Sequence, residues 1–197
     1  MRFKPAVPKN YTGITPIDAT NYNNPCIGLI PLDNPLPNGV PNEDCLYLNL
    51  WTPTINSSAN LPVMIWIYGG AFSIGSSSQQ LLYTPSFSSV FDGSQLSLRN
   101  VVIVSFNYRL GVFGFLYGNS SEAPGNAGYW DQAVAINWTR QYISAFGGNP
   151  NDITLFGQSA GSMSVSNHIV SPVTRNYFQK AIMQSGNYKL FKFYLVK

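Results

Sequence analysis

Two strand-length runs of almost purely apolar residues constrain the fold of this chain more than any other feature. One run is PVMIWIY, residues 62–68, and the other is VVIVSFNY, residues 101–108. Both are rich in β-branched and aromatic residues, and the first stops at a Gly-Gly pair. Strands that are apolar on both alternating faces are typical of a parallel sheet covered by helices on both sides. We therefore expect two central strands that are buried on both faces.

Patterns on either side of these runs predict further elements. Residues 46–52 alternate with period two, which predicts a half-buried strand, and residues 129–145 predict a helix that ends at GGNP, where Gly147 can adopt a left-handed cap. Strands are predicted at 153–157 and 180–185, with a helix at 160–170 between them. Alternating strands and helices indicate an α/β fold with right-handed crossovers. The predicted apolar stripe of the first helix consists of Trp130, Val134, Trp138 and Tyr142.

Composition limits the classes of partner. Charged residues make up 10% of the 197 residues, against about 25% in a typical domain, and the net charge is +3 with no basic run. A phosphate-tracking surface needs clustered Lys and Arg, so nucleic acid is not an expected partner. The longest apolar runs are strand-sized, so we expect a soluble protein without a transmembrane segment. No signal peptide is visible at Met1, because Pro5 and Pro8 interrupt the stretch that should be apolar.

Two cysteines and several sequons favour a secretory compartment. Cys26 and Cys45 flank a stretch rich in proline, which is typical of a compact loop that a disulfide could close. Two unpaired thiols are the alternative. Glycosylation acceptor patterns occur at Asn10, Asn56 and Asn119; a further one at Asn137 lies inside the predicted helix and is the weakest candidate.

The stretch GQSAG, residues 157–161, places Ser159 between a predicted strand and a predicted helix. A serine on such a sharp turn needs flanking glycines, because a side chain at either position would clash in the reversal. The N–H of Ala160 and the positive end of the helix dipole would face an oxyanion formed beside Ser159. A five-residue pattern also arises by chance, so its context between strand and helix carries the hypothesis.

A second glycine turn follows the apolar run that ends at Tyr68. Gly69 and Gly70 lie at the carboxyl edge of the predicted sheet, which is also the edge of the serine turn. We expect the N–H groups of Gly70 and Ala71 to be two further oxyanion donors. An ordinary glycine turn after a strand is the alternative, and the nearby serine turn argues against it.

His168 is the one histidine of the chain and lies nine residues after Ser159. Along a helix that begins near Ala160, this separation amounts to roughly 13 Å of axial rise. A base must come within about 3 Å of the hydroxyl, so we expect His168 to meet a neighbouring polar group instead. No Ser-Lys motif offers a replacement at Lys180 or Lys189.

Together these motifs closely resemble the carboxylesterase type-B family, which includes carboxylesterases, cholinesterases and related lipases. The resemblance implies an α/β-hydrolase fold and a serine carboxylesterase that acts on small carboxylic esters through an acyl-enzyme, without a cofactor or a metal. Ser159 corresponds to the nucleophile, and Gly70, Ala71 and Ala160 to the oxyanion hole. The motifs are RFKP (2–5), EDCLYLNLWTP (43–53), VMIWIYGGAF (63–72), NYRLGVFGFL (107–116), GNAGYWDQ (125–132), FGGNPNDITLFGQSAGS (146–162) and KAIMQSG (180–186).

The resemblance also implies a disulfide and two ion pairs, and this sequence departs from the family pattern at several positions. Cys26 and Cys45 correspond to the first disulfide of the family, and two buried ion pairs are expected, Arg2 with Glu43 and Arg109 with Asp131. Ala71 stands where many members have glycine, and Gln158 stands where most have glutamate, so a cationic substrate would lose an attraction. The loop between the cysteines contains no Trp, which disfavours cholinesterase activity.

The family pattern places the triad acid and histidine well after the serine. The residues that follow Ser159 contain no Asp or Glu, and residues 187–197 resemble the family no further. We therefore expect residues 1–197 to be one partial α/β-hydrolase domain from the amino-terminal half of a secreted enzyme, with weak activity of its own. An exposed sheet edge is expected to promote self-association. The alternatives are a catalytically inactive adhesion-type homologue and a fragment without function.

Overall fold

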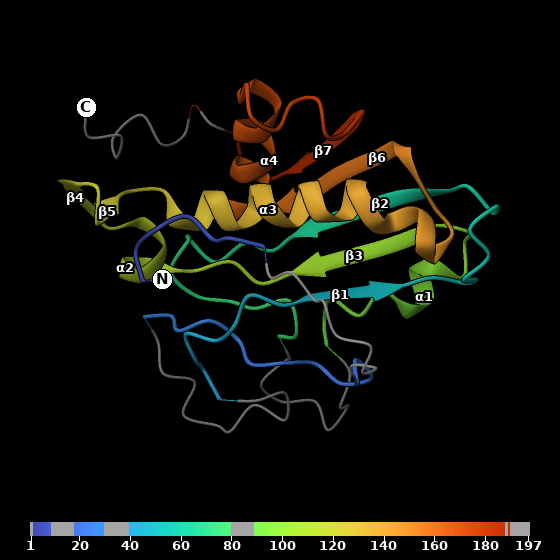
Figure 1. Ribbon diagram of the computed structural model, residues 1–197, viewed down its shortest axis with the longest axis horizontal. Coiled ribbons are helices and arrows are strands. Elements are labelled where there is room, and N and C mark those ends of the chain that lie inside the picture. The colour runs from blue at the N-terminus through green and yellow to red at the C-terminus, as the bar shows by residue number, and fades with distance from the viewer. Residues whose placement is uncertain (1, 9–17, 30–39, 80–88, 188, 190–197) are drawn as a thin grey trace.

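A five-stranded sheet forms the centre of the computed structural model, which describes residues 2–8, 18–29, 40–79, 89–187 and 189. The strand order is β1-β3-β2-β6-β7 (Figure 1). β1 pairs antiparallel with β3, and all other neighbours pair parallel, so the expected mostly parallel sheet is confirmed. The strands are β1 Leu48–Trp51, β2 Leu61–Ile67, β3 Val102–Phe106, β6 Gly148–Gln158 and β7 Lys180–Gln184.

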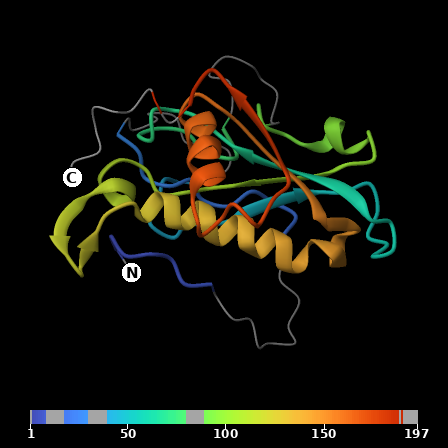
Figure 2. The same ribbon diagram turned by 90° about the horizontal axis from the view of Figure 1, so that it is seen from above.

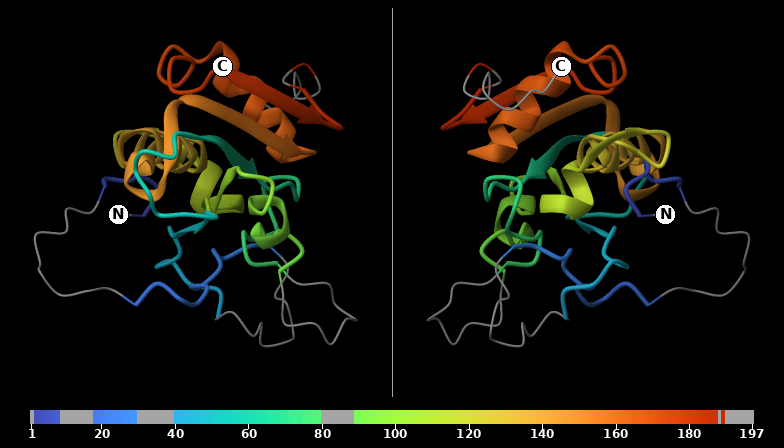
Figure 3. Two further views of the ribbon diagram at one scale, coloured as in Figure 1. Left: turned by 90° about the vertical axis from the view of Figure 1, so that its right-hand side faces the viewer. Right: turned by 90° about the vertical axis from the view of Figure 1, so that its left-hand side faces the viewer.

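Helices lie on both faces of this sheet (Figure 2). α3 (Ala127–Tyr142) and α4 (Ala160–Val170) cover one face, and the short α1 (Ser94–Ser97) lies on the other. A short helix, α2 (Gly111–Phe115), and the hairpin of β4 (Tyr117–Ser120) and β5 (Ala123–Pro124) project from one end. Side views place α4 and β7 at one extreme of the molecule and residues 18–29 near the other (Figure 3).

The two central strands are buried to different extents. Every residue of β3 is buried, as expected for a strand covered on both faces. β2 departs from the expectation, because Val63, Ile65 and Ile67 are fully buried while Met64 and Trp66 keep partial exposure. The inward residues pack under α3 and α4, whereas Trp66 packs against the rings of Phe156 and Phe91, with centroids 4.8 and 5.2 Å from its own. One face of β2 is therefore fully buried, and the other face is partly buried.

The prediction that the apolar stripe of α3 forms the buried face of the helix was wrong. Trp130 and Tyr142 are 39% and 51% exposed, whereas Gln132 and Ile136 are fully buried. The reason is close packing, because a Cβ at Gly128 would lie 2.5 Å from the carbonyl oxygen of Arg109. Small residues and internally bonded polar residues occupy the close face, and the aromatic residues point elsewhere.

Element boundaries follow the sequence predictions with local shifts. α4 and β7 occur where predicted, while β6 starts five residues earlier than expected, at Gly148. α3 ends at Tyr142 and continues as a 3-10 turn, Ile143–Phe146, and Gly147 caps it with φ of 79°. Among the described residues, no helix is both long and apolar enough to cross a membrane.

The cysteine pair forms a disulfide, Cys26–Cys45, so the alternative of two free thiols does not hold.

Arg109 and Asp131 form a buried ion pair, with Nη2 2.6 Å from Oδ1 and Nε 2.7 Å from Oδ2. Arg2 also pairs with Glu43, but the expectation that this pair is buried was wrong, since the two side chains are 59% and 43% exposed. The pair lies at the surface, and most of its charge stays in contact with water.

Candidate functional site

Ser159 lies on the turn between β6 and α4, with φ of 55° and ψ of −121°. This left-handed backbone is costly for a residue with a side chain and persists only where the surroundings enforce it. Close packing at the two flanking glycines holds Ser159 in this backbone conformation. A Cβ at Gly161 would lie 1.9 Å from the carbonyl oxygen of Ile67, and one at Gly157 would lie 2.7 Å from the carbonyl carbon of Gly161. The turn therefore excludes a side chain at both positions, as the sequence predicted.

Ala160 opens α4, and its side chain is buried. The first N–H groups of a helix have no partner within the helix, and the helix dipole adds positive potential at this end. The carbonyl of Ser159 already accepts the first bond of the helix, from the N–H of Met163 at 3.0 Å. An anion beside Ser159 would therefore lie at the favourable end of α4.

The glycine turn after β2 lies directly against the serine turn. β2 and β6 are parallel neighbours, with Ile67 opposite Gly157, so both turns leave the sheet at the same edge. A Cβ added at Gly69 would lie 3.0 Å from the Cβ of Ser159 and 2.5 Å from the carbonyl oxygen of Gln158. The structure therefore brings the predicted residues of the two turns together.

The backbone of this glycine turn is unusual for three residues in succession. Gly70, Ala71 and Phe72 all have positive φ, of 120°, 54° and 58°. The carbonyl of Gly70 accepts bonds from the N–H groups of Ser73 and Ile74, at 2.9 and 3.0 Å, which ties the turn back on itself. Left-handed alanine and phenylalanine residues mark a conformation that the surrounding structure imposes, a pattern that often accompanies a functional site.

The end of β7 supports the serine turn from the opposite side, which the residue patterns did not predict. The N–H of Ser159 donates to the carbonyl of Gln184 at 2.9 Å, and Ser162 Oγ donates to the carbonyl of Gly186 at 2.6 Å. A Cβ at Gly186 would lie 2.9 Å from the carbonyl oxygen of Ser159. The glycine that ends the motif KAIMQSG was the available signal, because a glycine after a strand often marks a close backbone approach.

His168 is buried on α4 and bonds on both sides of its ring. Nδ1 lies 3.0 Å from Thr174 Oγ1, and Nε2 lies 2.9 Å from Gln132 Oε1. Burial lowers the pKa of His168 to about 4, so the ring is neutral at pH 7. The predicted structural role with polar neighbours is confirmed, and His168 is not positioned to take a proton from Ser159.

Gln158 immediately precedes Ser159 and is exposed. Its side-chain oxygen lies near Gly69, since a Cβ there would come within 2.9 Å of Oε1. The amide carries no charge, so the potential at the serine turn comes from the backbone and the helix dipole. Among the described residues no cluster of His, Cys, Asp or Glu could hold a metal ion.

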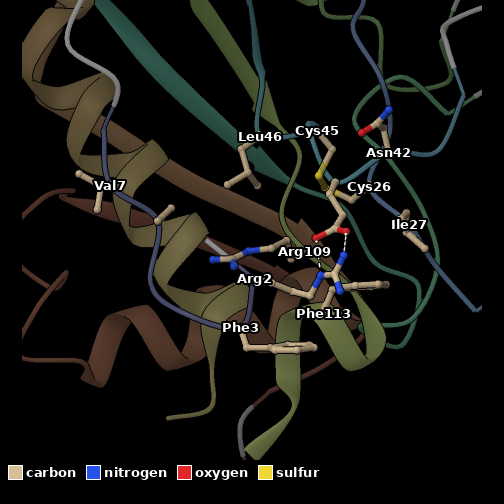
Figure 4. Close-up of a pocket in the computed structure, with 12 residues that line it drawn as sticks. Arg2, Phe3, Val7, Cys26, Ile27, Asn42, Cys45, Leu46, Arg109 and Phe113 are labelled. Atoms are coloured by element: carbon tan, nitrogen blue, oxygen red, sulfur yellow. Dashed lines mark hydrogen bonds and ion pairs between the residues drawn. A yellow bond between two sulfur atoms is a disulfide. The ribbon is translucent and has the colours of Figure 1, made fainter. Parts of the chain in front are cut away.

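A separate pocket of about 210 Å³ surrounds the disulfide (Figure 4). Phe3 and Phe113 stack there with centroids 6.0 Å apart, and the guanidinium of Arg2 lies 5.7 Å from the Phe113 ring. Small-molecule sites usually measure about 300–1,000 Å³. This pocket is smaller and contains none of the residues of the two turns, so it is separate from the candidate site.

The predicted glycosylation sites differ in what the structure describes. Asn56 and Asn119 are exposed and lie in a loop and in β4, respectively. Asn10 lies outside the described residues. Asn137 lies within α3, where Thr139 of its sequon is fully buried, so the structure agrees with treating it as the weakest candidate.

Comparison with known proteins gives consistent matches. The model of the carboxylesterase family matches residues 1–191. The chain is 45% identical to an acetylcholinesterase from Danio rerio over 195 residues, which cover 94% of this chain and 29% of that protein. It is 51% identical to a bile salt-activated lipase from Bos taurus over 148 residues, which cover 74% of this chain and 24% of the lipase. An acylcarnitine hydrolase from Mus musculus is 49% identical over 147 residues, with the same coverage. The chain thus spans less than a third of each relative.

Proposed function

The chain belongs to the carboxylesterase family, and from this membership we propose that it supplies the nucleophile and the oxyanion hole of a serine carboxylic-ester hydrolase. One observation carries the proposal: the strained turn of Ser159 lies in contact with the glycine turn after β2, at the start of a helix. A side chain held in this way at the edge of a parallel sheet is accessible to a substrate, and its backbone surroundings favour negative charge.

The chemistry follows from these positions. Ser159 Oγ attacks the carbonyl carbon of an ester, and the carbonyl oxygen becomes an oxyanion that accepts hydrogen bonds from the N–H groups of Gly70, Ala71 and Ala160. The C–O bond to the alcohol breaks, and the acyl group stays on Ser159. Water then attacks the acyl-enzyme and releases the carboxylic acid, which restores the serine.

Both steps need a base that takes the proton of Ser159 or of water. His168 is the one histidine in the sequence, and both of its ring nitrogens lie within hydrogen-bonding distance of other groups. We expect turnover by this chain alone to be on the order of 10⁴-fold or more below that of an intact triad, because loss of any triad member has about this effect.

The neutral site favours uncharged esters over cationic ones. Gln158 supplies no negative charge beside Ser159, and the loop between Cys26 and Cys45 contains no Trp that could stack on a quaternary ammonium group. Part of this loop, residues 30–39, lies outside the described residues. Although one relative is an acetylcholinesterase, we propose a general carboxylesterase rather than a cholinesterase activity for this chain.

A secretory compartment fits the disulfide best. Disulfides such as Cys26–Cys45 persist in oxidising compartments and are rare in the cytosol. The exposed sequons at Asn56 and Asn119 are accessible to glycosylation in the same compartment. We therefore propose that the protein is folded in the secretory pathway.

Acetylation by p-nitrophenyl acetate tests the proposed function. We expect peptide mass spectrometry of the quenched reaction to find the acetyl group on Ser159, with slow release of p-nitrophenol thereafter. The Ser159→Ala variant should lose this modification, whereas Ser94→Ala, at an exposed serine of α1, should keep it. A folded chain that acetylates other serines as readily as Ser159 would support the inactive adhesion-type alternative. Fast turnover that depends on Ser159 would instead show that a base is present.

A further inference from the structure

The carbonyl oxygen of Tyr68 lies at the point where the glycine turn leaves the sheet. The pairing between β2 and β6 ends at Ile67 opposite Gly157, so this carbonyl lies beyond the ladder. Tyr108 Oη donates a hydrogen bond to it at 2.9 Å. A Cβ at Gly161 would lie 2.8 Å from the same oxygen, so the carbonyl also lies against the first turn of α4. A side-chain hydroxyl therefore holds the backbone where the glycine turn meets α4.

Tyr68 and Tyr108 form a buried and reciprocally bonded pair. Both side chains are fully buried, and their rings stack with centroids 4.5 Å apart. Tyr68 Oη donates to the carbonyl of Tyr108 at 3.2 Å and accepts from its N–H at 3.3 Å. Burial raises the pKa of both hydroxyls, so each stays protonated at neutral pH. Because the pair is buried, loss of the Tyr108 hydroxyl would leave the carbonyl of Tyr68 without a donor that water could replace.

The segment between β3 and α2 also holds the far end of the glycine turn. The N–H of Gly111, the first residue of α2, donates to the carbonyl of Phe72 at 2.7 Å. The buried ion pair of Arg109 and Asp131 anchors this segment, since the N–H of Arg109 also donates to Asp131 Oδ2, at 3.1 Å. The proposed oxyanion donors lie in the chain between the two carbonyls that are held. One anchored segment, which begins with Tyr108, therefore fixes both ends of the turn.

We propose that Tyr108 is a positioning residue, whose hydroxyl sets the direction of the N–H groups of Gly70 and Ala71. The proposal rests on the proposed function, in which these N–H groups stabilise the oxyanion. Without the hydrogen bond, the peptide plane that follows Tyr68 could tilt, and the next N–H groups would turn away from the reacting oxygen. A displacement of about 1 Å in a site of this kind can lower a rate on the order of a hundredfold. Tyr108 would act through the backbone and not by touching the ester.

A matched pair of variants separates positioning from the loss of a buried hydroxyl. Tyr108→Phe removes the hydroxyl and keeps the stacked ring. Thr139→Val is the control, because Thr139 is fully buried and its Oγ1 donates to the carbonyl of Ala135 at 2.9 Å within α3. We expect acetylation of Ser159 by p-nitrophenyl acetate, followed by peptide mass spectrometry, to slow roughly tenfold or more in Tyr108→Phe. Thr139→Val should keep the rate of the parent chain, and equal slowing of both variants would overturn the proposal.

The carbonyl stretch of the acetylated chain reports the oxyanion hole directly. Hydrogen bonds from N–H groups polarise the acyl carbonyl and lower its stretching frequency. With a carbon-13 label at this carbonyl, we expect the infrared band of acetylated Ser159 to lie lower in the parent chain and in Thr139→Val than in urea. In Tyr108→Phe the band should move towards its position in urea. An unchanged band in a folded Tyr108→Phe chain would show that the hydroxyl serves stability alone, and would overturn the proposal.

A conservative variant provides a rescue. Tyr108→4-aminophenylalanine keeps the ring and places an N–H donor where the hydroxyl was, so it should restore both the lower frequency and the faster acetylation. Failure of this variant to recover either property, while it folds as the parent chain does, would overturn the assignment of the effect to the hydrogen bond.

Measurements on the unlabelled chain distinguish failure of the nucleophile from failure of the positioning role. If Ser159 is not acetylated in the parent chain, the proposed function fails. Residual dipolar couplings still measure the orientations of the N–H groups of Gly70 and Ala71. These orientations should change in Tyr108→Phe and not in Thr139→Val, and identical couplings in all three chains would overturn the proposal.

Stability of the variant is controlled separately. If Tyr108→Phe does not fold in buffer, all chains are compared in trimethylamine N-oxide, which favours the folded state. A Tyr108→Phe chain that stays unfolded there would assign the hydroxyl to folding itself and would also overturn the proposal.

Discussion

At the scale of single residues, three residues with strained backbones lie where the candidate chemistry is proposed. Ser159, Ala71 and Phe72 all have left-handed backbones, at φ of 55°, 54° and 58°. Each such residue costs of order 1–3 kcal/mol, and the surrounding contacts must compensate for that cost. Backbone atoms of neighbouring segments lie close to Gly69 and Gly161. This close packing leaves no space in which the two turns could adopt a relaxed conformation.

Ala71→Gly should stabilise the fold. Glycine adopts φ of 54° without the steric cost that alanine has, although it gains freedom in the unfolded chain. We expect the free energy of unfolding in urea to rise by about 0.5–1 kcal/mol. Ala59→Gly is the control, because Ala59 has no positive φ, and it should lower stability by a similar amount. A loss of stability in Ala71→Gly would contradict the strain assigned to this turn.

Gln158→Glu should change selectivity rather than the fold. The new carboxylate would lie beside Ser159 at an exposed position, where one charge attracts another by on the order of 1 kcal/mol. We expect phosphonylation of Ser159 by a probe with a trimethylammonium leaving group to accelerate roughly fivefold relative to its neutral isostere, and less in high salt. An unchanged ratio of the two rates would show that this residue does not set the potential at the site.

At the scale of elements, polar side chains hold α4 against α3. Gln132 Nε2 donates to Ser164 Oγ at 3.1 Å, and Gln132 Oε1 lies 2.9 Å from His168 Nε2. Because Gln132 Oε1 can only accept, His168 Nε2 carries the proton. This network fixes the helix that begins next to Ser159, so it contributes to the position of the serine turn.

His168 should make stability depend on pH. Its pKa is about 4 in the folded state and about 6.5 in the unfolded state, so the unfolded chain binds the proton more tightly. The stabilisation is present above pH 6.5 and is lost as pH falls towards 4. Between pH 7 and 4.5 the loss should be about 2–3 kcal/mol in urea unfolding. His168→Asn should lose less than the parent chain over this interval, and an equal loss would show that other groups cause the acid sensitivity.

Sequence patterns predicted the order of elements and the serine turn because these depend on local chemistry. Apolar runs, flanking glycines and helical periodicity each depend on about ten consecutive residues, and they predicted β2, β3, α4 and β7 at the correct positions. The buried face of α3 was wrong because it depends on distant partners. Gln132 can be buried because its side-chain amide forms hydrogen bonds with His168 and Ser164. The sequence near Gln132 does not contain these distant partners. Likewise, exposure of the Arg2–Glu43 pair depends on how the N-terminal segment packs.

At the scale of the whole molecule, the sheet ends in an exposed strand. β7 is last in the strand order of the described residues, and all five of its residues are exposed, including Ile182 and Met183 at 44% and 47%. An edge strand with apolar side chains is a template for pairing with another chain. In an antiparallel pair of two copies centred on Ile182, each Lys180 would face Gln184, so no like charges oppose each other.

We therefore predict concentration-dependent association through β7. Sedimentation velocity should detect dimers, and Ile182→Lys should weaken association at least tenfold, because it places a charge at the centre of the edge. Ile55→Lys is the control, since Ile55 is 80% exposed in a loop outside the sheet, and it should associate like the parent chain. A monomer at all concentrations, or equal weakening by both variants, would contradict this prediction.

We propose that the fold itself makes Ser159 reactive, because it holds this residue at the start of α4 against the turn at Gly69 and Gly70. The most direct test compares the folded chain with the same chain in urea after treatment with an alkyl fluorophosphonate, with the modified residue identified by peptide mass spectrometry. We expect Ser159 to be the phosphonylated residue of the folded chain, at a slow rate because His168 is not positioned to take its proton, and we expect no phosphonyl group on Ser159 in the unfolded chain. Equal labelling of Ser159 in both states, or no labelling of it in the folded chain, would contradict the claim.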